Sequence, residues 1–255
     1  MLKIKFKNND YLMARIMISK SVMPKSFANY LWYKYKPSYS NLMKNIKSKD
    51  IDNNIILELQ QQNFFNDYLK SANENLDRIK NLWNKNANKI NLFLLKIFKK
   101  DFDINVTAII LPPILNTGTS LKNNLIVWGH ENGLKDADYD LVYLVHESLH
   151  SYLEKDDISH AIIENIADIT LKKYLSGTEF GYDTHPYLQS VHEKILPYWN
   201  EYLSNINIKH YSENLLADNS LILNSSTNKN FKIKNMNINE FITFLKQLNL
   251  ENSTD

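Results

Sequence analysis

The segment "LVYLVHESLHSYLEKDDISHAIIENIAD", residues 141–168, holds three of the seven histidines of the chain. Two of these, His146 and His150, bracket Glu147 in the pattern H-E-x-x-H. Residues four apart lie on one face of a helix, so both imidazoles can reach one metal ion. Glu147 is turned by about 100° from His146 and can instead contact a water on that ion. The pattern therefore predicts a zinc site with a general base beside it.

The simpler alternative is an amphipathic helix whose solvated face carries histidines. The apolar run that precedes His146, residues 141–145, favours the metal site, because such a site requires a buried helix. Catalytic zinc usually takes three protein ligands and leaves one position for water. The next predicted helix offers His160, Glu164 and Asp168, which are four residues apart and so share one face.

His146, Glu147 and His150, followed by Glu164-x-x-x-Asp168, resemble the gluzincin clan of metallopeptidases, the thermolysin-like superfamily. In that clan, H-E-x-x-H on one helix is completed by the glutamate of E-x-x-x-D on the next. The resemblance implies that His146, His150 and Glu164 bind one Zn²⁺ per chain and that Glu147 is the general base. It also implies that Asp168 accepts a hydrogen bond from a ligating imidazole, which we expect to be that of His146.

Several features leave alternatives to this assignment. The connection between the two helices is shorter than in thermolysin, so a tight turn must join them. His160 is the rival third ligand, and Asp168 has a rival role as a surface carboxylate paired with Lys172. A metzincin site would need glycine and histidine where this chain has Leu153 and Asp156. A deformylase-type site would need a cysteine, and the chain has none.

Peptide hydrolysis also needs a donor for the negative charge that forms on the carbonyl oxygen. In gluzincins this donor is typically a Tyr or His that follows the third ligand. The segment "FGYDTHPY", residues 180–187, offers His185, Tyr182 and Tyr187, which we rank in that order because Pro186 restrains the backbone of His185. The alternative is that these aromatic side chains pack a loop between helices.

The remaining histidines have no metal-ligand residues at the spacing that a metal site needs, so we expect them to have structural roles. They are His130, His192 and His210.

Apolar periodicity and turn residues predict the remaining elements. We expect helices at residues 10–35 (with a break around Pro37), 51–99, 141–153, 159–174, 185–204 and after Asn237, strands at 104–113 and 123–133, a turn at 116–120 and a polar loop at 224–230. Aspartates at 136–140 would cap the first site helix and Ser159 the second, while Glu240 would complete a capping box. In gluzincins an edge strand binds extended substrate, and residues 124–128 are the candidate here.

These elements predict an α+β fold that is mainly helical, with a small sheet packed beside the H-E-x-x-H helix, as in zincins. We expect an N-terminal helical region at residues 1–100, a zincin-like catalytic domain at 101–200 and a C-terminal helical region at 201–255.

Composition narrows the class of protein. Among 255 residues, 44% are hydrophobic, and only five are glycine, which disfavours a glycine-rich nucleotide site. The net charge of +2 gives no electrostatic footprint for nucleic acid or an anionic membrane. The absence of cysteine removes disulfides and thiolate ligands. The longest apolar segments are too short to span a bilayer. We expect a cytoplasmic protein with no nucleic-acid or membrane partner.

The predicted function is a zinc-dependent metallopeptidase that acts on a peptide or protein substrate. The alternative is a catalytically inactive, peptidase-like binding or regulatory protein that retains the zinc site. The presence of Glu147 argues against that alternative, because a purely structural site needs no base. Hydrolysis of a non-peptide amide would use the same site with a different pocket.

Overall fold

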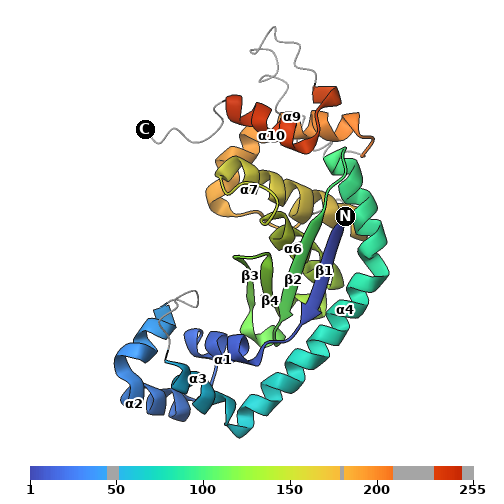
Figure 1. Ribbon diagram of the computed structural model, residues 1–255. Coiled ribbons are helices and arrows are strands. Elements are labelled where there is room, and N and C mark those ends of the chain that lie inside the picture. The colour runs from blue at the N-terminus through green and yellow to red at the C-terminus, as the bar shows by residue number, and fades with distance from the viewer. Residues whose placement is uncertain (45–51, 179–180, 209–232, 249–255) are drawn as a thin grey trace. The chain divides into compact units, whose positions relative to one another are not determined.

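The computed structural model describes residues 1–44, 52–178, 181–208 and 233–248 (Figure 1). Its strands are β1 (Leu2–Lys7), β2 (Ile104–Ile110), β3 (Thr117–Leu121) and β4 (Leu125–Gly129). Its α-helices are α1 (Asp10–Ser19), α2 (Lys25–Lys44), α3 (Asn53–Gln60), α4 (Asn63–Phe98), α5 (Asn132–Lys135), α6 (Ala137–Leu149), α7 (Asp157–Glu164), α8 (Lys172–Ser176), α9 (Gln189–Asn205) and α10 (Ile238–Gln247). Three short 3-10 helices are η1 (Pro113–Leu115), η3 (Pro186–Leu188) and η4 (Ile233–Asn235). The segment η2 (Asn165–Leu171) is a π-helix. The predicted α+β, mainly helical fold is confirmed.

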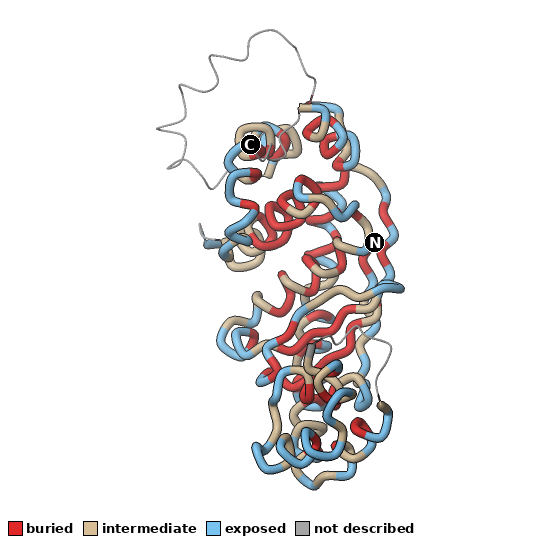
Figure 2. The backbone as a smooth tube through the Cα atoms, turned by 90° about the vertical axis from the view of Figure 1, so that its left-hand side faces the viewer, coloured by how far each residue is buried: buried red, intermediate tan, exposed pale blue. Residues whose placement is uncertain are grey.

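The chain divides into two compact units. Unit 1 contains Met1–Lys3, Lys85–Asn105 and Leu141–Asp255, and unit 2 contains Ile4–Asn84 and Val106–Asp140. Buried positions follow the strands and the inner faces of the helices in each unit (Figure 2). None of the helices in the described ranges is long and apolar enough to cross a membrane.

The four-stranded sheet, which apart from the ends of β1 and β2 belongs to unit 2, has the order β1-β2-β4-β3. β4 pairs in parallel with β2, aligning Thr107 with Leu125, and antiparallel with β3, aligning Gly118 with Trp128. The prediction that residues 124–128 form an edge strand is therefore wrong. Both sides of β4 already hold backbone partners, so it cannot add a strand of substrate.

The predicted turn at residues 116–120 is also wrong, because most of this segment forms β3. The chain reverses instead at Asn123 and Asn124, whose φ angles of 62° and 54° lie in the left-handed region that asparagine tolerates. Gly118 permits the close approach of β3 to β4, since a Cβ at that position would lie 2.3 Å from the ring of Trp128.

Helices α1 to α3 form the core of unit 2 together with residues of β2 and β4. Its buried members include Met13, Ile16, Leu31, Leu42, Ile55, Leu59, Ile109 and Val127. The predicted helix at residues 10–35 is divided into α1 and α2, and α2 continues beyond the predicted break to Lys44. The break is a kink, with Lys36 at φ 7° and ψ −85° directly before Pro37. The periodicity over residues 51–99 predicts either one long helix or two consecutive helices, and the structure has two, α3 and α4.

A buried polar network in unit 2 holds the first turn of α6, the helix that carries H-E-x-x-H. Asp140 is fully buried and accepts hydrogen bonds from Nε1 of Trp128 at 2.7 Å and from Nη2 of Arg78 at 2.6 Å. Asp136 caps the same helix by accepting from the backbone of Asp138 at 3.0 Å, as expected. Because a buried carboxylate is costly without partners, these contacts fix where the helix begins.

In unit 1, α6 ends at Leu149, earlier than the predicted residue 153. The cap of α7 is Asp156 rather than the predicted Ser159, whose backbone nitrogen and hydroxyl both donate to it at 2.8 Å. The predicted capping box of Asn237 and Glu240 on α10 is confirmed, and α9 accounts for the predicted helix at 185–204. The predicted loop at 224–230 lies outside the described residues.

Candidate metal centre

The two histidines of H-E-x-x-H lie at the end of α6, in unit 1. His146 is on the helix, and His150 follows its last residue but still donates its backbone hydrogen to the carbonyl of His146, at 3.3 Å. Their Nε2 atoms face each other at 3.1 Å. Two nitrogens on a tetrahedral zinc ion would be about 3.3 Å apart, given Zn–N distances of about 2.0–2.1 Å. The separation therefore suits two ligands of one ion.

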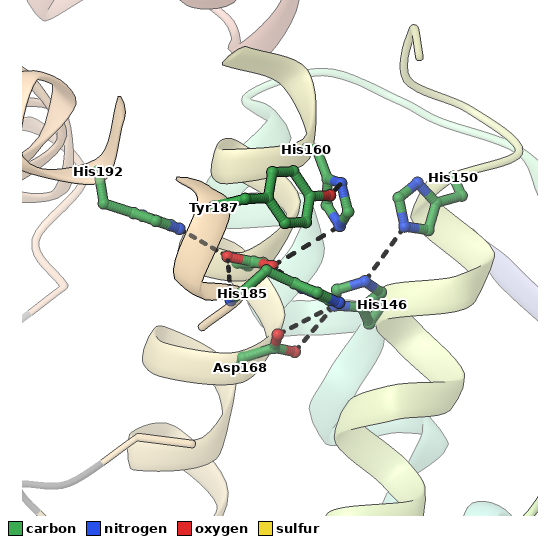
Figure 3. Close-up of polar contacts among 8 residues, drawn as sticks. His146, His150, His160, Asp168, His185, Tyr187 and His192 are labelled. Carbon is green, nitrogen blue, oxygen red and sulfur yellow. Dashed lines mark hydrogen bonds and ion pairs between the residues drawn. The ribbon is translucent and has the colours of Figure 1, made fainter. Parts of the chain in front are cut away.

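Asp168 contacts the ring nitrogen of His146 that points away from His150. Its two carboxylate oxygens lie 3.0 and 3.1 Å from Nδ1 of His146 (Figure 3). Both side chains are buried, with 4% and 1% of their surface exposed. Burial lowers the pKa of His146, but the charge of Asp168 outweighs it and the net direction is upward. A proton held on Nδ1 leaves the lone pair of Nε2 directed toward His150. This contact is the one expected for Asp168 from the family pattern.

The widened π-helix η2 positions Asp168 one turn after Glu164. Within this segment the hydroxyl of Thr170 donates to the backbone carbonyl of Asn165, five residues earlier in the chain, at 2.6 Å. Such π-segments occur often at functional sites. Gly181 then lets the chain return across η2, since a Cβ there would lie 2.7 Å from the backbone of Ile169.

A third histidine completes a group with the two of H-E-x-x-H. One ring nitrogen each of His146, His150 and His160 lies within 4.8 Å of the others, so the three could hold a metal ion. The rings of His150 and His160 are nearly perpendicular, with centroids 4.7 Å apart. The sequence pattern predicts Glu164 as the third member, but among the described residues the structure brings His160 to this place. Since α6 ends early and α7 begins at Asp157, the first turn of α7 lies opposite His150.

Glu164 belongs to a second, overlapping group with His160 and His185, which could also hold a metal ion. Its carboxylate is fully buried. It accepts from the backbone nitrogen of His185 at 3.2 Å, from Nδ1 of the same residue, and from Nε2 of His192 at 2.6 Å. Burial raises the pKa of Glu164, but the hydrogen bonds from His192 and His185 outweigh it and hold the pKa below its ordinary value.

His192 belongs to the site although the sequence predicts only a structural role for it. The residue comes from α9 and reaches Glu164 because α9 packs against α7. No local spacing links two residues so far apart in the chain. His130, in unit 2, accepts from the backbone nitrogen of Asn132 at 3.2 Å, in keeping with its structural role. His210 lies outside the described residues.

Two of the three predicted oxyanion donors contact the cluster directly. His185 lies beside Glu164 with 49% of its side chain exposed, and the hydroxyl of Tyr187 is 2.9 Å from Nδ1 of His160 (Figure 3). Tyr182 stacks instead on Tyr143, with ring centroids 5.7 Å apart. Tyr143 in turn lies against His146, at 5.8 Å between centroids.

The environment of two of the imidazoles disfavours their charged form. Burial, followed by the charge of His146, lowers the pKa of His150 to about 3, and burial also lowers the pKa of His160. A neutral imidazole is the form that binds a metal. Glu147 is half-buried on α6, and its charge raises the pKa of His146.

No protein-family model, curated protein or solved structure matches the chain. The site of this fold is a cluster of imidazoles and carboxylates that could hold a metal ion.

Proposed function

We propose that the protein is a zinc-dependent hydrolase that cleaves peptide bonds. The observation that carries the proposal is the pair of Nε2 atoms of His146 and His150, 3.1 Å apart, with Asp168 bound to the far side of the His146 ring. A histidine with a carboxylate behind it is the usual arrangement of a zinc-binding imidazole. Glu147, next to His146 on the same helix, supplies the group that a catalytic site needs and a structural site does not.

His146, His150 and His160 would hold the ion in this proposal. Three imidazoles with an open fourth position form a known catalytic ligand set. The gluzincin pattern places Glu164 in the third position, and that assignment stays a prediction which substitution can test. Zinc suits neutral imidazole nitrogens and, when bound, lowers the pKa of a water and polarises a carbonyl oxygen.

Each of the other side chains at the site then has its own role in hydrolysis. Glu147 takes a proton from the attacking water and returns it to the leaving amine, as general base and then general acid. Asp168 keeps the proton of His146 on Nδ1. His185, or Tyr187 beside it, donates to the oxygen that becomes negative in the transition state. The choice of a peptide substrate rests on the resemblance of H-E-x-x-H and E-x-x-x-D to gluzincins.

Glu147→Gln tests the proposal, because the amide keeps the shape of the side chain but cannot accept the proton. We expect the variant to retain zinc and to lose at least about 10²-fold in the rate of peptide-library cleavage, followed by mass spectrometry. Glu193→Gln, on an exposed turn of α9, is the matched control and should cleave like the parent protein. Cleavage at an undiminished rate by Glu147→Gln would contradict the proposal. Zinc retention with no cleavage by either form would favour the peptidase-like binding protein.

A further inference from the structure

The cluster contains more metal-binding side chains than one catalytic ion uses. The two overlapping groups comprise His146, His150, His160, Glu164 and His185, and His192 contacts Glu164 from α9. A catalytic zinc ion takes three protein ligands. When one ion is bound by His146, His150 and His160, two ligand-type side chains remain together on the other side of His160.

Those two side chains are already close to each other. Nδ1 of His185 contacts Oε1 of Glu164, and Nε2 of His192 binds the other oxygen, Oε2, at 2.6 Å. His192 thereby fixes the orientation of the carboxylate. Nε2 of His160 lies 3.6 Å from Oε1, farther than a hydrogen bond, and has no hydrogen-bond partner within the described ranges. That nitrogen is available to the first ion, and the buried carboxylate of Glu164 beside it has histidines as its charged partners, which makes it suited to a cation.

We infer that Glu164 and His185 form a second divalent cation site, adjacent to the first and bordered by His160. The mixed carboxylate and imidazole ligands select a transition-metal ion of the Zn²⁺ or Co²⁺ type over Mg²⁺ or Ca²⁺, which prefer oxygen ligands alone. Half of the His185 side chain is exposed, so the site is open to solvent at this residue. In two-metal hydrolases a second ion stabilises charge on the reacting oxygens.

This site goes beyond the proposed function but rests on its ligand set, in which His146, His150 and His160 hold the first ion and leave Glu164 and His185 for the second. Hydrogen bonds from His185 and His192 to Glu164 are the competing explanation of the same contacts. They would orient the carboxylate without binding any ion. The two explanations differ in the number of metal equivalents that the protein binds.

The experiment is a titration of the full chain, freed of metal by a chelator, with Co²⁺ and separately with Zn²⁺. Bound equivalents are counted by calorimetry and elemental analysis, and the visible spectrum of Co²⁺ reports its ligands. We expect two equivalents for the parent protein, one for His185→Ala, and one for the double variant His146→Ala/His150→Ala. His130→Ala, in unit 2, removes a histidine outside the cluster and should still bind two.

The outcomes separate the second site from the proposed function. A single equivalent in the parent protein that survives His185→Ala and is lost in the double variant would overturn the second site. Two equivalents in His185→Ala would overturn it as well. A single equivalent that is lost in His185→Ala and survives the double variant would support the second site while contradicting the proposed catalytic ion. Glu164→Gln, which preserves side-chain volume, should also lose the second equivalent, and circular dichroism shows that each variant is folded.

Discussion

Asp168 and His146 form a buried pair in which both carboxylate oxygens approach the same ring nitrogen, at 3.0 and 3.1 Å. The two residues come from different helical segments, η2 and α6, so the pair joins these segments at the candidate metal site. This contact turns the other ring nitrogen of His146, Nε2, toward His150.

Asp168→Asn should weaken zinc binding without preventing it. An amide can still accept the hydrogen bond but no longer supplies a charge that strengthens the imidazole as a ligand. Residues in this role typically contribute about 10- to 100-fold in metal affinity or activity. Competition with a chromogenic chelator measures the change. Asp103→Asn, at an exposed position, is the control, and equal affinities for both variants would assign Asp168 a purely structural role.

His160→Ala and Glu164→Ala should differ in their effect on the first ion. His160 lies with His146 and His150, so its removal should strip the ion that is bound at low zinc concentration. Glu164→Ala should keep that ion. Elemental analysis after equilibration with one equivalent of zinc makes the comparison. If Glu164→Ala is stripped and His160→Ala is not, the third ligand is the one that the gluzincin pattern implies.

With one bound zinc equivalent, at which the second site is empty, His185→Ala should lower kcat by about 10²-fold, the usual loss when one oxyanion donor is removed. The Michaelis constant should change little, because the donor acts mainly in the transition state. Tyr182→Phe is the comparison, since that ring stacks on Tyr143 and the substitution removes only a hydroxyl. An equal loss in Tyr182→Phe, with normal turnover in His185→Ala, would transfer the role to Tyr182.

Asp156→Ala should destabilise the protein by about 1 kcal/mol at neutral pH, the typical effect of losing a helix cap. The carboxylate binds Ser159 at the start of α7 and Nζ of Lys246 on α10, at 2.8 Å each. Burial raises the pKa of Asp156, but these contacts outweigh it and lower the pKa below its unfolded value. The stabilisation is therefore present above about pH 4, the usual pKa of an unfolded aspartate, and is lost as the pH falls through the lower folded value.

Urea unfolding at pH 7 and near pH 3 measures this dependence. The difference between the parent protein and Asp156→Ala should shrink at the lower pH. Asp156→Asn should keep part of the cap while losing the pH dependence. A difference that grows with acid would contradict this assignment of the pKa shift.

The part of the site that could be predicted from sequence depends on local helix geometry. The spacing of His146 and His150 places both rings on one side of α6 whatever the remainder of the chain does. Asp168 could be paired with His146 only through the gluzincin pattern. His192 and its contact with Glu164 depend on how α9 packs against α7, which no short-range spacing reports.

The errors in the predicted secondary structure also have local reasons. β1 has the alternating pattern "LKIKFK" that is typical of a strand, but the predicted elements begin only at residue 10. Without β3, residues 124–128 appeared to lie at the edge of the sheet. At α7, Asp156 and Ser159 are both good capping residues, and the chain uses the earlier one.

The proposed function requires that His146 and His150 bind a zinc ion. Zinc content of the parent protein and of the double variant His146→Ala/His150→Ala, equilibrated in the same buffered zinc solution, tests it most directly. We expect at least one equivalent in the parent protein and one fewer in the double variant, with both proteins folded. Equal zinc content in the two proteins would contradict it.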